Sequence, residues 1–136
     1  MSTPTLHIAV GVLINEQGRV LIAQRRSGTD GAGKWEFPGG KRESGENIEA
    51  ALARELDEEL GIQVQQLRPM LRFHHDYTER RVQLDIWRVD AWHGEAHGRE
   101  GQKVTWCAPQ RLCDYDLLSA NKPIVDAIRL PNTYVI

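Results

Sequence analysis

One stretch of the sequence, Gly40 to Ile62, places a glycine-rich turn directly before a segment that carries a cluster of acidic residues. Asn47 and Gly61 are residues favoured at the start and the end of helices, so we expect a helix from Ile48 to Leu60. At about 100° per residue, three leucines of this helix form one apolar stripe: Leu52, Leu56 and Leu60. The sequence therefore predicts a helix that packs on a core and holds its acidic residues beside a turn.

The acidic cluster consists of Glu55, Glu58 and Glu59, which lie within one turn of each other on the expected helix. Like charges at this spacing repel one another by about 0.2–0.5 kcal/mol per pair, and Arg54 offsets only part of that charge. One interpretation is a solvated acidic face. The other is a site for a hard divalent cation such as Mg2+, which takes oxygen ligands and joins carboxylates to phosphates. The pattern alone leaves both open.

Strand composition recurs through the rest of the chain. We expect strands at 7–15, 20–25, 35–37, 64–75 (broken at Pro69), 82–92 and 103–107. A turn at 16–19 is expected to join the first two strands into a hairpin, a polar turn is expected at 76–81, and loops at 27–33 and 93–102. A second helix over 120–130 would turn inward Ile124, Val125 and Ile128. Together these elements indicate an α/β sandwich.

The chain has 136 residues and a net charge of -2, which suits a single domain and gives no general attraction to nucleic acid. No apolar run is long enough to span a membrane, and the N-terminus does not have the pattern of a signal peptide. Cys107 and Cys113 lie in no zinc-binding pattern. We therefore expect a cytoplasmic monomer whose partner is a small molecule, with neither nucleic acid nor a membrane involved.

The turn and helix resemble the signature of the Nudix family: Gly40, Glu46 and Arg54-Glu55-Leu56-x-Glu58-Glu59-x-Gly61-Ile62 match it without a departure. Further segments are similar to the MutT branch of that family: Ile8–Gly11, Trp35–Lys41, Gly94–Glu95, Glu100–Gln102 and Ala120–Pro123. The resemblance implies an α/β/α sandwich with a mixed β-sheet between helices, formed by residues 1–131. It also implies hydrolysis, with Mg2+ or Mn2+, of oxidised purine nucleoside triphosphates such as 8-oxo-dGTP. The products would be nucleoside monophosphate and pyrophosphate, and the nucleotide pool would be cleansed of precursors that cause replication errors.

The same resemblance assigns roles to individual residues. The metal ligands would be Gly39 through its carbonyl group, and Glu55, Glu58, Glu59 and Glu100. The catalytic groups would be Glu55, Glu58 and Glu100, with Glu100 or Glu55 removing a proton from the attacking water. A solvated loop acid is the alternative for Glu100. Glu46 and Arg54 are expected to hold the turn on the helix, since an arginine can pair bidentately with a carboxylate.

The substrate would be bound by Arg25, Glu36, Phe37, Pro38, Gly39, Arg80 and Asn121. Arg25 resembles an arginine that meets phosphate, whereas Arg26 is expected to be a solvated neighbour. Asn121 resembles an asparagine that hydrogen-bonds the purine edge, because an amide donates and accepts at once. The alternatives are a turn charge for Arg80, a core position for Phe37 and a helix cap for Asn121. Asp30 stands where the family pattern has a histidine, which adds a negative charge near the expected triphosphate site.

Three other functions are alternatives to this one. A Nudix hydrolase could act on another substrate, such as a dinucleoside polyphosphate or ADP-ribose. A non-catalytic nucleotide-sensing Nudix domain commonly lacks glutamates of the family signature, and none is lacking here. A nucleic-acid-binding module is disfavoured by the charge. The segment 132–136 resembles a junction to a further domain in longer chains, so we expect a C-terminal tail or truncated linker there, from a shortened or partly expressed fusion.

Overall fold

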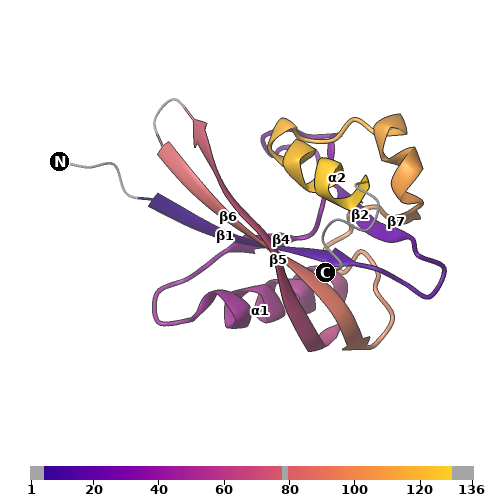
Figure 1. The fold of residues 1–136 in the computed structure, drawn as a ribbon, viewed down its shortest axis with the longest axis horizontal. Helices are drawn as coiled ribbons and strands as arrows, with labels where there is room; N and C mark the ends of the chain where they lie inside the picture. Colours follow the sequence, from indigo (N-terminus) through magenta and orange to yellow (C-terminus); the bar gives the residue numbers. More distant parts are fainter. Residues whose placement is uncertain (1–4, 78–79, 130–136) are drawn as a thin grey trace.

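The computed structural model describes residues 5–77 and 80–129, which form two β-sheets with helices on both sides (Figure 1). The long elements in chain order are β1 (Thr5–Leu13), β2 (Val20–Gln24), α1 (Ile48–Leu60), β5 (Gln63–Tyr77) and β6 (Arg80–His93). The shorter ones are β3 (Trp35–Glu36), β4 (Gly39–Lys41), β7 (Val104–Cys107), the 3-10 helices η1 (Pro109–Asp114) and η2 (Ser119–Asn121), and α2 (Lys122–Arg129). No helix of this described part is long and apolar enough to cross a membrane.

The strands form a four-stranded sheet in the order β4-β1-β6-β5 and a three-stranded sheet in the order β3-β2-β7. β1 runs parallel to β6, in a register that pairs Val10 with Ile86, and the other pairings between these strands are antiparallel. The sheet layer is thus mixed, as the sequence predicted. It consists, however, of two sheets, and β1 and β2 belong to different ones.

The predicted hairpin between the first two strands is therefore wrong. Only one bridge, Ile14 with Val20, joins them beyond the turn. The turn itself forms: the Asn15 side chain accepts hydrogen bonds from the backbone N–H groups of Gln17 and Arg19, at 3.0 and 2.9 Å. Both strands are nearly continuously apolar, so each finds its main partners elsewhere, and the local turn does not decide the pairing.

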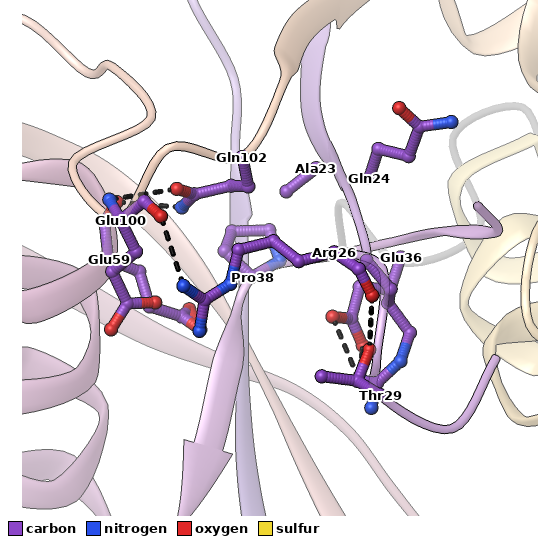
Figure 2. Close-up of a pocket in the computed structure, with 10 residues that line it drawn as sticks. Ala23, Gln24, Arg26, Thr29, Glu36, Pro38, Glu59, Glu100 and Gln102 are labelled. Atoms are coloured by element: carbon purple, nitrogen blue, oxygen red, sulfur yellow. Dashed lines mark hydrogen bonds and ion pairs between the residues drawn. The ribbon is translucent and has the colours of Figure 1, made fainter. Parts of the chain in front are cut away.

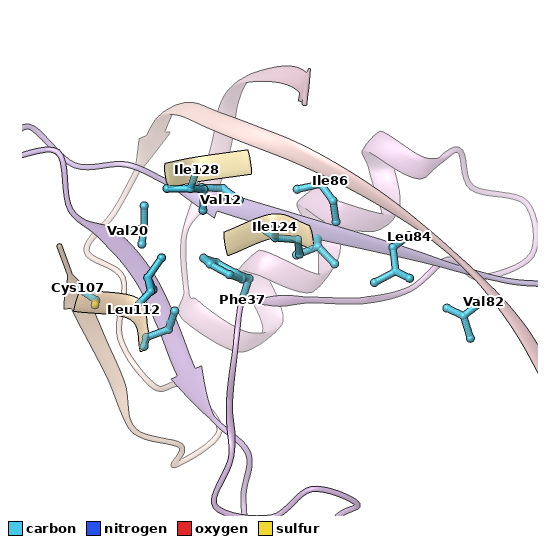
Figure 3. Close-up of a cluster of buried hydrophobic side chains, with 12 residues drawn as sticks. Val12, Val20, Phe37, Val82, Leu84, Ile86, Cys107, Leu112, Ile124 and Ile128 are labelled. Atoms are coloured by element: carbon cyan, nitrogen blue, oxygen red, sulfur yellow. The ribbon is translucent and has the colours of Figure 1, made fainter. Parts of the chain in front are cut away.

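Two hydrophobic clusters lie on opposite faces of the strands. Along β1, Ala9 and Leu13 pack with the buried residues of α1, while Val10 and Val12 pack on the other face with Ile124 of α2. This alternation follows from the two-residue period of a strand. Figure 3 shows the second cluster, where α2 covers the side chains of several strands: Val12, Val20, Leu84 and Ile86. One helix on each face confirms the α/β/α sandwich.

Helix α1 spans Ile48–Leu60, as predicted. The Asn47 side chain accepts a hydrogen bond from the Ala50 N–H at 2.8 Å, and Gly61 adopts the left-handed conformation at φ 70° as its N–H donates to Asp57 O. The predicted stripe of Leu52, Leu56 and Leu60 is fully buried. Local caps and an apolar stripe thus fix both the ends of the helix and its buried face.

The β5–β6 hairpin is longer than predicted. β5 continues through Pro69, where the register with β6 shifts before Leu71, so the proline produces an irregularity and does not end the strand. The expected polar turn at 76–81 is largely paired: Asp76 lies opposite Arg81, and Tyr77 opposite Arg80. The second helix begins at Lys122, directly after the 3-10 helix η2, and buries Ile124 and Ile128. The tail at 132–136 lies outside the described residues.

Candidate active site

Strand β4 brings two glycines against the first strand and helix α1. At Gly39, where φ is 154°, a Cβ atom would overlap the backbone of Ala9 and would lie 2.8 Å from Val10 Cα. At Gly40, a Cβ atom would overlap the carboxyl group of Glu55. The absence of side chains at these two positions therefore lets the turn lie directly on β1 while a carboxylate of α1 lies directly on the turn.

Arg54 holds the turn on the helix, as predicted. Its Nη2 and Nε donate to the two carboxylate oxygens of Glu46 at 2.7 and 3.1 Å, and Nη2 also donates to Lys41 O at 3.0 Å. Its Nη1 donates to Glu55 at 2.9 Å and lies 3.4 Å from Glu58. The hydrogen bond from Arg54 lowers the pKa of Glu46. One guanidinium thus fixes the glycine-rich turn on the helix and orients Glu55 beside it.

Glu59 is the most perturbed carboxyl group of the site. Burial raises its pKa to about 8, and the neighbouring charges of Glu55, Glu36 and Glu100 act in the same direction. A hydrogen bond of 3.0 Å from the Gly39 N–H partly opposes the shift. Burial likewise raises the pKa of Glu55, in spite of its contact with Arg54. Negative charge is therefore concentrated here beyond what the nearby cations offset.

The loop that carries Glu100 is anchored to the end of helix α1. The last carbonyl groups of a helix lack partners within it. Here Asp57 O accepts from the Arg99 guanidinium at 2.9 Å, and Glu59 O accepts from the Arg99 N–H at 3.0 Å and from Gln102 Nε2 at 2.9 Å. Gln102 Oε1 also accepts from the Glu100 N–H at 2.9 Å. The helix end thereby holds Glu100 close enough to Glu59 to raise the pKa of Glu59.

These groups open onto a cavity of about 170 Å3 between α1, β2 and the loop 27–33. Figure 2 shows the carboxylates of Glu59 and Glu100 on one side, the Arg26 side chain extending toward them, and Glu36 near the loop. Arg25 and Pro38 also line the cavity. Carboxylates and guanidinium groups thus meet in one small polar space, where the former suit a cation and the latter suit an anion.

The two neighbouring arginines differ in their contacts. Arg25 Nη1 lies 3.1 Å from both carboxylate oxygens of Glu36, and Nε donates to the backbone oxygen of Asp30 at 2.5 Å. Arg26 Nη1 donates to the backbone oxygen of Glu100 at 3.1 Å. Arg26, expected from the sequence to be a solvated neighbour, lines the cavity. The available signal is its place two residues after the end of β2, where the loop begins, because binding residues often lie on loops that a rigid scaffold positions.

Phe37 and Asn121 lie away from this cavity. The Phe37 side chain is buried in the core with Ile124, which matches the alternative given for it from sequence. The buried Asn121 side chain accepts a hydrogen bond from the Phe37 N–H at 3.0 Å, so this contact joins distant parts of the chain and does not cap the last helix. This leaves its amide N–H2 without a hydrogen bond to the described residues. Arg80 is exposed at the tip of the β5–β6 hairpin and does not line the cavity.

The predicted metal ligands are near one another but are not arranged as a finished site. Within residues 5–77 and 80–129, no three His, Cys, Asp or Glu side chains are placed to hold a metal ion. Glu55 accepts from Arg54, Glu59 accepts from Gly39, and Glu58 is half-exposed. The donor set nonetheless fits a hard divalent cation, since it consists of carboxylate oxygens and its most buried member has no ion pair with the described cations.

Comparison with known proteins shows the family of this chain. The model of the NUDIX domain family matches residues 9–127. The chain is 38% identical over 124 residues to the 8-oxo-dGTP diphosphatase of Escherichia coli, covering 91% of this chain and 96% of that protein. It is 37% identical over 118 residues to the CTP pyrophosphohydrolase of the same organism, covering 87% of each.

A solved structure shares the fold. It comes from a study of MutT from Aliivibrio salmonicida and Vibrio cholerae, and it superposes with a TM-score of 0.81 at 36% identity, over 92% of this chain and 97% of that one. The glycine turn, the arginine clamp and the buried glutamate therefore lie in a fold and a sequence pattern that are both matched over most of the chain. The chain belongs to the Nudix family.

Proposed function

We propose that this protein hydrolyses purine nucleoside triphosphates, with 8-oxo-dGTP as the preferred substrate, to the nucleoside monophosphate and pyrophosphate. The observation that carries the proposal is the cavity in which Glu59 and Glu100 face Arg26 (Figure 2). The protein would act as a monomer in the cytoplasm. There it would remove oxidised precursors from the nucleotide pool. The similarity to the E. coli 8-oxo-dGTP diphosphatase supports the choice of substrate.

The cofactor would be Mg2+ or Mn2+, held by Glu55, Glu58 and Glu59, with the Gly39 carbonyl group and Glu100 as further ligands. When bound, such a cation would neutralise phosphate oxygens and lower the pKa of a water molecule. The chain provides the rest: Gly40 leaves room for the Glu55 carboxylate, and Arg54 orients that carboxylate. The high pKa of Glu59 supports a role that requires a cation, because a positive charge there would favour the ionised form.

In the proposed reaction, the oxygen of water forms a bond to the β-phosphorus. The bond from the β-phosphorus to the oxygen that bridges the α-phosphate breaks, so that this oxygen leaves with the monophosphate. Glu100 or Glu55 accepts the proton of the water. Arg26, already directed into the cavity, and Arg25 meet the negative charge that spreads over the phosphate oxygens.

The choice of base would depend on Asn121. Its oxygen is engaged by the Phe37 N–H, and its amide N–H2 is available to donate to an acceptor on a base. The similar identity to a CTP pyrophosphohydrolase makes a pyrimidine triphosphate the second candidate. Both relatives are named for acting on a triphosphate, so the base and not the phosphate chain is the open question.

A substrate panel tests the proposal. Purified protein is incubated with 8-oxo-dGTP, dGTP, CTP, ADP-ribose and a dinucleoside polyphosphate, with Mg2+, with Mn2+ or with EDTA, and pyrophosphate and monophosphates are measured. We expect 8-oxo-dGTP to give the highest kcat/KM and EDTA to abolish turnover. A protein that binds nucleotides but hydrolyses none would be a sensing domain, and the proposal would be wrong.

Glu59→Gln provides the matching variant. It should lower kcat at least about 100-fold, because a neutral amide cannot replace the charged carboxylate as a ligand of the metal. The fold should stay intact. Glu49→Gln, an exposed change on the same helix, is the control and should behave as wild type. If Glu59→Gln keeps more than about a tenth of the wild-type kcat, the assignment of Glu59 as a ligand is wrong.

A further inference from the structure

A second, more open cleft adjoins the active-site cavity. Its volume is about 870 Å3, and it lies between the loop 27–33 and the start of β7. The two spaces share Gln24, Arg25, Arg26, Thr29 and Gln102 in their walls. An elongated ligand could therefore occupy both at once.

The two spaces differ in charge. Three carboxylates line the smaller cavity: Glu36, Glu59 and Glu100. None lines the second cleft, whose charged wall residues are all cationic: Arg25, Arg26 and Lys103. Arg25 is largely offset by Glu36 at 3.1 Å. Arg26 donates to a neutral carbonyl group, and neither Arg26 nor Lys103 has an ion pair with a carboxylate of the described residues.

Backbone contacts hold these two cations at the same edge. The Gln24 N–H donates to Lys103 O at 2.9 Å, which joins the start of β7 to the end of β2 directly before the two arginines. Thr29 Oγ1 donates to Arg26 O at 2.6 Å and so ties the loop 27–33 to the same point. The charges are therefore carried by paired strand ends, even though both side chains are exposed.

We propose that this cleft is a pyrophosphate subsite, which receives the β- and γ-phosphates of a nucleoside triphosphate and then the leaving pyrophosphate, and that Lys103 is a specificity-determining residue for the triphosphate tail. The proposal rests on the proposed function. The carboxylate-lined cavity would hold the scissile bond together with the metal. Arg26, which lies in both walls, would lie beside the phosphates at the junction. An ammonium group and a guanidinium group are the usual partners of such phosphate oxygens.

Lys103→Met tests the subsite. For 8-oxo-dGTP we expect KM to rise about 5- to 10-fold with kcat within about twofold, because the lost contact is made equally in the bound substrate and the transition state. Calorimetry with Mg2+ should show a similar loss of affinity for inorganic pyrophosphate and no change for the nucleoside monophosphate. Lys103→Arg should retain most of the affinity, and the difference between Lys103→Met and wild type should shrink at high salt.

Lys34→Met is the matched control. Lys34 is also an exposed lysine and directly follows the loop 27–33, but its side chain lines neither the cavity nor the cleft. If both variants weaken pyrophosphate binding equally, Lys103 acts only through the overall electrostatic potential of the protein, and the subsite is overturned. Unchanged pyrophosphate affinity in Lys103→Met would do the same and leave the proposed function intact. If wild type hydrolyses no triphosphate, the proposed function fails, while a Lys103-dependent affinity for pyrophosphate still supports the subsite.

Discussion

The carboxylate of Glu55 lies directly against Gly40, so closely that a methyl group at position 40 would overlap it. The overlapping atoms are at the end of a flexible side chain, which can move aside at little cost. We therefore expect Gly40→Ala to change the Tm by no more than about 3 °C. It should lower kcat at least about tenfold, because Glu55 can no longer occupy its place beside Glu59. Thermal unfolding and pyrophosphate release measure the two effects.

Gly39→Ala should destabilise the fold strongly, unlike Gly40→Ala. A methyl group there would overlap the backbone of Ala9, which is held in the pairing of β1 with β4 and cannot move aside. We expect a loss of about 3 kcal/mol or more in the free energy of unfolding, measured by urea denaturation. Similar stabilities for the Gly39 and Gly40 variants would contradict this account of the turn.

Glu59 should make the metal-free protein less stable as the pH rises. Burial raises its pKa from 4.5 to about 8, so the folded state retains a proton that the unfolded state releases. The stability that this proton contributes is complete below pH 4.5 and is lost as the pH rises to about 8. Glutamine cannot ionise, and it retains an oxygen that can accept from the Gly39 N–H.

Glu59→Gln should therefore be more stable than wild type at pH 9 by about 1–3 kcal/mol, and about as stable at pH 5, in the presence of EDTA. Urea denaturation at the two pH values measures the difference. The same gain at both values would mean that the pKa of Glu59 is not raised in the folded protein.

Two substitutions of Asn121 separate its structural contact from base recognition. Asn121→Ala removes the acceptor of the buried Phe37 N–H and should cost about 1–3 kcal/mol of stability. Asn121→Asp keeps an oxygen for that N–H but loses the amide donor. We expect it to fold and to lose about 1–3 kcal/mol of discrimination between 8-oxo-dGTP and dGTP, measured as the ratio of kcat/KM. Undiminished discrimination in Asn121→Asp would limit Asn121 to its contact with Phe37.

Arg54→Lys should destabilise the protein in spite of its unchanged charge. Lysine cannot reproduce the two parallel hydrogen bonds to Glu46 together with those to Lys41 O and Glu55. We expect a loss of about 1–3 kcal/mol in the free energy of unfolding. Arg68→Lys is the control, because Arg68 pairs with Asp90 on the exposed face of β5, where ion pairs contribute about 0–1 kcal/mol. Equal losses in both variants would show that the hydrogen bonds of the Arg54 guanidinium stabilise the fold no more than an ordinary surface ion pair does.

The sequence by itself determined helix α1, its caps, its buried stripe and the pairing of Arg54 with Glu46, because each depends on residues within about eight positions of one another. The same local signals predicted a β1–β2 hairpin, and there they were wrong. Two apolar strands that suit several partners are paired by the packing of the whole sheet, with β6 parallel to β1.

Only the tertiary structure decided which charged groups meet. Glu100 lies near Glu59 because helix carbonyl groups bind Arg99 and Gln102, and Arg26 reaches Glu100 across 74 positions of sequence. Lys103 joins the same edge through a backbone hydrogen bond between β2 and β7. Spacing along the chain does not encode such contacts, since they exist only after distant segments have packed, and the pKa of Glu59 is set by the burial that this packing creates.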